Sequence, residues 1–88
     1  MDTSTQLDTE IADRVKQIIA KKTGTTPDKI QAEQRLLEDL ELDSLGLIEL
    51  EMALETEFDC AIDDGKFLTL KTVQEIIDII AGIEQEPT

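Results

Sequence analysis

The stretch that decides the fold is Leu42-Asp43-Ser44-Leu45, with the helix that it predicts from Ser44 to about Asp59. At about 100° per residue, the large apolar residues of this helix separate into two stripes. One stripe spans roughly 80°, which is typical of a helix packed on a core. It comprises Leu47, Leu50, Leu54 and Phe58. The other lies on the opposite side and comprises Leu45, Ile48 and Met52. Because a small domain covers only one such face well, the second stripe indicates a partner.

Acidic residues border this second stripe, and Ser44 opens it. The 88 residues include 21 Asp and Glu against 8 Lys and Arg, a formal net charge of −13. Between Leu36 and Gly65 there are 11 acidic residues and no Lys or Arg. Clustering of this kind is typical of an interaction surface. We therefore expect partners with basic surfaces, no binding to nucleic acid and no insertion into membranes.

The composition argues against catalysis and metal binding. The sequence has no His, which excludes a Ser-His-Asp triad and imidazole ligation of a metal. Asp63-Asp64-Gly65 resembles the middle of a calcium loop, but its register places apolar and basic residues at ligand positions. The carboxylate pairs lie in acid-rich stretches that we interpret as solvated faces. We expect neither catalytic residues nor a metal site.

The sequence also bears on compartment and assembly. Residues 1–6 lack the basic and apolar regions of a secretory signal. Apolar runs stay well short of the roughly 18 residues of a membrane span. Cys60 is the single cysteine, which suits a reducing cytosol, and we interpret it as a half-buried apolar residue. We expect a cytoplasmic monomer.

The chain is interpreted as one domain, residues 1–88, ordered over about 7–82 with flexible tails at 1–6 and 84–88. Apolar spacing predicts helices at about 7–22, 44–59 and 73–81, the last ending at Gly82. A turn at 63–65 and a short helical turn within 66–70 precede the last helix. These elements predict an all-α antiparallel bundle with three main helices and a short third helix before the last.

Local signals support these boundaries. Asp43 is the predicted N-cap of the central helix, and Thr72-Val73-Gln74-Glu75 is a capping box. Gly46 is interpreted as leaving an approachable backbone beside Ser44. The connection over residues 25–42 is long, with a short turn at 26–30. Four leucines are expected to pin it to the bundle: Leu36, Leu37, Leu40 and Leu42.

The segment Leu37-Glu38-Asp39-Leu40-Glu41-Leu42-Asp43-Ser44-Leu45 resembles the phosphopantetheine attachment segment of acyl carrier proteins. The resemblance continues in order over roughly residues 7–81. Its further matches are Glu49-Leu50, Met52-Ala53-Leu54-Glu55, Glu57-Phe58-Asp59, Ile62, Thr72-Val73-Gln74 and Ile77-Asp78.

This resemblance implies a carrier rather than an enzyme. A phosphopantetheinyl transferase, using coenzyme A and magnesium, would join 4′-phosphopantetheine to Ser44, with Asp43 assisting. The arm would carry acyl groups as thioesters to enzymes of fatty-acid or related biosynthesis. Basic docking surfaces of those enzymes would meet Leu45, Ile48, Glu49, Met52 and Glu55. The residues assigned to the acyl cleft or core are Leu50, Leu54, Phe58, Ile62 and Phe67.

Some positions depart from the housekeeping fatty-acid carriers. Glu41 stands where they usually have glycine, Gly46 where they have a polar residue, and Glu51 where they tend to be apolar. Phe67 adds bulk beside the expected acyl cleft. We therefore expect a specialised pathway with its own partners and a different cargo. Aminoacyl or polyketide cargo stays open, as does a non-covalent acidic interaction module that uses the same stripe.

Overall fold

The structure is a computed structural model that describes residues 3–85. The predicted all-α bundle, with a short third helix before the last, is confirmed. Its elements are α1 (Thr3–Thr23), a 3-10 turn η1 (Pro27–Lys29), α2 (Ser44–Phe58), α3 (Asp64–Phe67) and α4 (Val73–Gln85).

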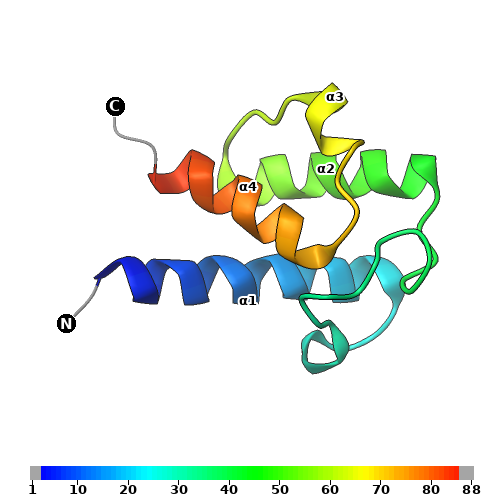
Figure 1. The fold of residues 1–88 in the computed structure, drawn as a ribbon, viewed down its shortest axis with the longest axis horizontal. Helices are drawn as coiled ribbons and strands as arrows, with labels where there is room; N and C mark the ends of the chain where they lie inside the picture. Colours follow the sequence, from blue (N-terminus) through cyan, green and yellow to red (C-terminus); the bar gives the residue numbers. More distant parts are fainter. Residues whose placement is uncertain (1–2, 86–88) are drawn as a thin grey trace.

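Figure 1 shows α1 running along one side of the molecule, with α2 antiparallel to it. α1 packs against both α2 and α4, and α3 packs against α2. The apolar faces of all four α-helices meet in one core. Among its fully or nearly fully buried side chains are Ile11, Val15, Ile19, Leu47, Leu50, Leu54, Phe58, Phe67, Val73, Ile76 and Ile80.

The outer helices are longer than predicted. α1 begins at Thr3, four residues before the first predicted position, so Thr3 to Gln6 form its first turns. α4 continues through Gly82 to Gln85. Gly82 is exposed and open space surrounds the position of an added Cβ, so nothing there forces the chain out of the helix. The rest of the predicted tails, residues 1–2 and 86–88, lies outside the described residues.

Both predicted caps are present. Asp43 Oδ1 accepts a hydrogen bond from the Gly46 N–H at 2.7 Å and caps α2. At α4, Thr72 Oγ1 accepts from the Glu75 N–H at 3.3 Å, and Glu75 Oε1 accepts from the Thr72 N–H at 3.0 Å. Hydrogen bonds from the backbone N–H groups of Lys71 and Thr72 hold the pKa of Glu75 below its usual value.

The long connection before α2 is tied to the start of α4. The N–H of Leu36 donates to the Lys71 carbonyl at 2.8 Å, and the Gln74 N–H donates to the Ala32 carbonyl at 2.8 Å. Leu36 is fully buried, whereas Leu37 is exposed, so the prediction that Leu37 pins this loop is wrong. Leu36 uses its side chain as the anchor, and the next residue therefore points outward.

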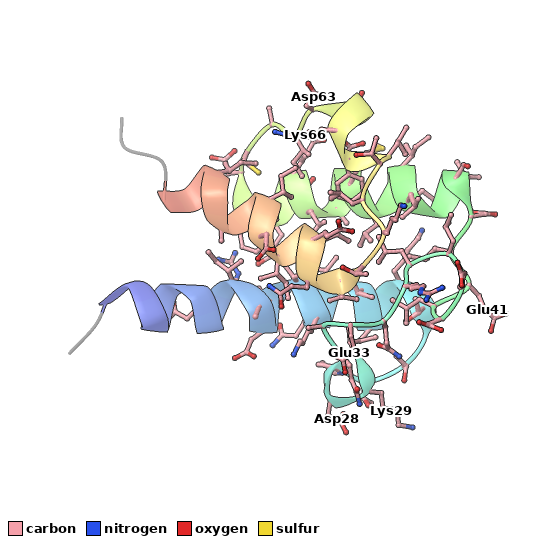
Figure 2. The ribbon with its side chains drawn as sticks, viewed as in Figure 1. Asp28, Lys29, Glu33, Glu41, Asp63 and Lys66 are labelled. Atoms are coloured by element: carbon pink, nitrogen blue, oxygen red, sulfur yellow. The ribbon has the colours of Figure 1, made fainter. Side chains whose placement is uncertain are left out.

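The region around α3 is shifted relative to the prediction. Asp63 caps α3 through a 3.0 Å hydrogen bond from the Lys66 N–H to Oδ1, so the helix begins at Asp64 and includes Gly65. The predicted turn at 63–65 and helical turn within 66–70 are therefore wrong by about two residues. Figure 2 shows Asp63 and Lys66 on the α3 side of the molecule, away from α1.

Candidate functional site

Ser44 occupies the first position of α2 and is exposed to solvent. The N–H groups at the start of an α-helix have no partners within the helix, and the helix dipole is positive there. A phosphate joined to a hydroxyl at this place therefore meets a favourable field. The hydroxyl is on the surface rather than inside the bundle, so there is room for a bulky substituent.

Gly46 has a different role from the one that its sequence position suggested. It is buried, so its backbone is not an approachable surface beside Ser44. A Cβ at this position would lie 3.1 Å from Asp43 Oδ1 and 3.3 Å from Leu42 Cδ2. The missing side chain therefore leaves room for the cap of α2 and for the leucine of the preceding loop.

The second stripe of α2 is exposed. Leu45 is 63%, Ile48 41% and Met52 59% exposed. Leu68, directly after α3, is also an exposed large apolar residue and lines a pocket with Ile48 and Met52. The apolar surface thus extends beyond α2, which helical periodicity alone could not indicate. Its use as a docking surface stays a prediction.

The acidic residues beside this stripe have bonds within the protein. Glu49 forms an ion pair with Lys22 of α1. Glu55 Oε2 accepts a 2.8 Å hydrogen bond from the Ile62 N–H and thereby ties the loop after α2 to the helix. The two glutamates that were expected to meet basic groups on partner enzymes therefore also stabilise the bundle.

A second ion pair joins α1 to the end of α2. Arg14 Nη2 lies 2.6 Å from Glu57 Oε2, and the guanidinium lies over the Phe58 ring at 4.4 Å from its centroid. Asp59 then ends α2 in the left-handed conformation, at φ 49°. Together, this contact and the Lys22–Glu49 pair join α2 to α1 at two points, in the first half of α2 and at its C-terminal end.

Glu51 contradicts the interpretation of the acidic residues as solvated faces. It is only 3% exposed, and it lies between the buried stripe and Ile48. Burial, together with a hydrogen bond to the Asp64 carboxyl, raises the pKa of Glu51 to about 7. The signal in the sequence was its spacing, because Leu47 at i−4 and Leu54 at i+3 place Glu51 at the edge of the buried arc.

A pocket opens between α2 and α3, and we call it the acid pocket. Its volume is about 300 Å³. It is lined by Ile48, Glu51, Met52, Glu55, Asp64 and Leu68. The five residues assigned to the acyl cleft or core are all buried in the core: Leu50, Leu54, Phe58, Ile62 and Phe67.

The residues that the structure describes include neither a metal-binding cluster nor a membrane-spanning helix. No group of three or more His, Cys, Asp or Glu side chains there is arranged to hold a metal ion. Within residues 3–85, no helix combines the length and the hydrophobicity needed to span a membrane. Cys60 is half-buried at the end of the central helix, as its sequence context suggested.

The fold and the site define a small helical carrier domain, in which an exposed serine begins a helix beside an apolar stripe. Residues 13–80 match the phosphopantetheine attachment site family, and the chain belongs to that family. It is therefore a carrier protein rather than an enzyme, and its prosthetic group is covalently attached 4′-phosphopantetheine.

Individual relatives agree with this assignment. The chain is 48% identical over 63 residues to an acyl carrier protein of Bdellovibrio bacteriovorus, covering 72% of this chain and 81% of that one. It is 45% identical over 71 residues to one of Thermosynechococcus vestitus, covering 81% and 88%. A solved structure of a proposed acyl carrier protein from Mycobacterium tuberculosis superposes with a TM-score of 0.74. That protein is 35% identical, with 81% of this chain and 95% of the other covered.

Proposed function

We propose that Ser44 is the attachment residue and that the chain carries acyl intermediates as thioesters to enzymes of fatty-acid or related biosynthesis. One observation carries the proposal. The sequence contains two serines, Ser4 and Ser44, and only Ser44 falls within the residues 13–80 that match the family. It is also exposed, at the helix start where a phosphate is favoured.

The residues around Ser44 fit the prosthetic group. The Ser44 hydroxyl oxygen would hold the phosphate through a phosphodiester, and the exposed surface leaves room for the arm. When bound, the arm supplies a terminal thiol on which acyl groups are held as thioesters. Asp43 fixes the start of α2 by accepting from the Gly46 N–H. We propose that its carboxylate also assists the transferase, as the resemblance implies.

The apolar stripe and the acidic surface suit transient docking. Partners in this proposal are a phosphopantetheinyl transferase and acyl-loading, elongating or transferring enzymes with basic surfaces. Opposite charge speeds the encounter and sets its orientation, while a small apolar contact limits affinity and permits release. Leu45, Ile48 and Met52 form that contact. The proposed compartment is the cytoplasm, which the single cysteine suits.

Intact mass spectrometry tests the attachment residue. The full chain is incubated with coenzyme A, magnesium and a broad-specificity phosphopantetheinyl transferase. We expect the wild type and Ser4→Ala to gain one phosphopantetheine and Ser44→Ala to gain none. An unchanged wild type would favour the non-covalent interaction module, and a gain by Ser44→Ala would refute the assignment of the residue.

A further inference from the structure

The acid pocket combines apolar walls with carboxylates and has no basic residue in its lining. Ile48, Met52 and Leu68 supply the apolar surface, while the acids come from both α2 and α3. Its volume of about 300 Å³ is at the lower end of the range of small-molecule sites, about 300 to 1,000 Å³. A ligand that fits is therefore small and has both an apolar part and a polar group that suits carboxylates.

One oxygen of Glu51 lacks a hydrogen-bond partner within the described residues. Its Oε2 atom is enclosed and accepts no hydrogen bond, and the hydrogen bond between the Glu51 and Asp64 carboxyl groups exists only when one of them holds a proton. Glu55 and Asp63 each accept a backbone hydrogen bond, from the N–H groups of Ile62 and Lys66 respectively, and Asp64 is exposed to water. A buried acceptor without a donor is costly, so Glu51 is the group in this pocket that a ligand would satisfy.

The charges around Glu51 favour a cationic donor. Three carboxyl groups act on it, those of Asp64, Glu55 and Asp63, and all three raise its pKa. Such a cluster is relieved either by a bound proton or by a cation. The described acids are not arranged to hold a metal ion. An ammonium group meets the remaining requirements, since it brings three N–H donors and one positive charge.

Glu51 and Ser44 lie close enough on α2 for a group attached at Ser44 to reach the acid pocket. Seven residues separate them, nearly two helical turns, so both lie on the same side of α2. The axial separation is about 10 Å. A group carried from Ser44 therefore passes over Ile48 and reaches the pocket mouth without crossing to another face of the helix.

We propose that the acid pocket binds a primary ammonium group on a short apolar stem, and that the cargo of this carrier bears such a group. The cargo class is then an aminoacyl group. This inference rests on the proposed attachment at Ser44, whereas recognition of ammonium by the pocket does not depend on any attachment.

The first experiment uses the full unmodified chain and free ligands. n-Butylammonium and n-butanol are titrated separately while the methyl signals of Ile48, Met52 and Leu68 are followed by NMR. We expect the ammonium to bind about tenfold more tightly than the alcohol, because a hydrogen bond to a charged group adds to the apolar contact. Equal affinities, or no saturating shift with the ammonium, would overturn the proposal.

Matched variants locate the interaction. Glu51→Gln keeps the size of the side chain but removes its charge, and we expect it to bind the ammonium no better than the alcohol. Asp64→Asn is a second variant, on the exposed side of the pocket, and should weaken ammonium binding. Glu33→Gln removes an equal charge from the exposed loop near η1 and should leave binding unchanged (Figure 2). Equal losses in Glu51→Gln and Glu33→Gln would mean that only net charge matters, and would refute the pocket.

The pH dependence provides an independent readout. The carboxyl groups of Asp64, Asp63 and Glu55 face Glu51 and favour its protonated form. Because the ammonium replaces the proton held by Glu51, binding of the ammonium to the wild type should tighten as pH rises from 6 to 8. Glu51→Gln should show a flat profile over this range. A flat profile in the wild type would exclude Glu51 as the binding group.

A second experiment tests whether the ammonium group that the pocket binds belongs to the cargo. A lysine side chain of a partner enzyme would present the same chemistry. The chain is loaded by the transferase with 4-aminobutyryl or pentanoyl phosphopantetheine, and free n-butylammonium is titrated again. We expect the 4-aminobutyryl form alone to weaken binding of the free ligand, by at least about fivefold. Equal competition by both forms, or none, would refute the cargo class. A failure to load at Ser44 would refute the proposed function, but the result of the first experiment with free ligands would still hold.

Discussion

Leu54 and Met52 lie two residues apart on α2, yet Leu54 is fully buried and Met52 is 59% exposed. Both faces of this helix have large apolar residues, and the sequence pattern predicts that the Leu54 face packs on the core and that the Met52 face stays open for a partner. What separates them is burial: the Leu54 face shares one core with buried residues of α1, α3 and α4, whereas the Met52 face lines the acid pocket and stays exposed. An exposed apolar stripe of this kind contributes nothing to the core, and its acidic border is the feature that supports the proposed docking of partners.

The largest expected effect comes from a pair of alanine variants, one on each face of α2. Leu54→Ala should lower the free energy of unfolding by about 3 kcal/mol, because it leaves a cavity in the core. Met52→Ala should lower it by less than about 0.5 kcal/mol, since its side chain is exposed. Urea denaturation followed by circular dichroism measures both.

For docking, the order of the two variants should be reversed, with Met52→Ala having the larger effect. Met52→Ala should reduce kcat/KM for phosphopantetheinylation by about tenfold, as expected for an exposed residue at the centre of a contact. If Met52→Ala destabilised the fold as much as Leu54→Ala while loading normally, the distinction between the two faces would be lost.

Glu51, on the border between the faces, should make stability depend on pH. Its pKa is raised from 4.5 to about 7 in the folded protein, so the folded state holds a proton that the unfolded state releases. The stabilising contribution is fully present below pH 4.5 and is lost as pH rises through 7. Between pH 5 and pH 8 the wild type should lose about 2 kcal/mol more stability than Glu51→Gln.

Denaturation midpoints of the two proteins at several pH values give this difference directly. Glu51→Val should be more stable than the wild type at pH 8, because an apolar side chain replaces a buried carboxylate. If the stability of the wild type and of Glu51→Gln changed with pH in parallel, the proton taken up on folding would be bound by a group other than Glu51.

Asp43 allows the structural and functional roles at the start of α2 to be separated. Asp43→Ala should cost about 1 kcal/mol of stability by removing the cap from the Gly46 N–H. Asp43→Asn keeps an oxygen that can accept the same bond, so it should retain most of the stability. If the carboxylate assists modification, both variants should load phosphopantetheine more slowly, whereas loading at the wild-type rate by Asp43→Asn would restrict Asp43 to capping.

The smallest effect concerns the loop that leads into α2. Glu41 has φ 57°, in the left-handed region that favours glycine. Glu41→Gly should therefore raise stability by about 0.5 kcal/mol, the relief of backbone strain being partly offset by the greater freedom of glycine in the unfolded chain. Glu41→Ala keeps the strain and should show no gain in a thermal melt. A gain shared by both variants would instead indicate relief of charge repulsion.

The sequence predicted the elements whose causes are local. The stripe through Leu50 and Leu54 follows helical spacing, and the caps at Asp43 and Thr72 follow from side-chain chemistry next to the helix start. The sequence was less informative about features that depend on contacts with another element. The burial of Glu51 depends on α3 packing against α2, and Gly46 matters because Leu42 folds back beside it. α3 begins earlier than predicted because Asp63 caps a helix instead of forming part of a turn.

Among the residues of α3, Phe67 alone is buried. By contrast, the Lys22–Glu49 and Arg14–Glu57 pairs fasten the central helix to the longest one. α3 is therefore the α-helix with the fewest buried side chains, and the pocket wall that it forms is expected to open at a lower free energy than the rest of the bundle. Any such opening would also move Leu68, so the size of the acid pocket and the shape of the exposed apolar surface would change together.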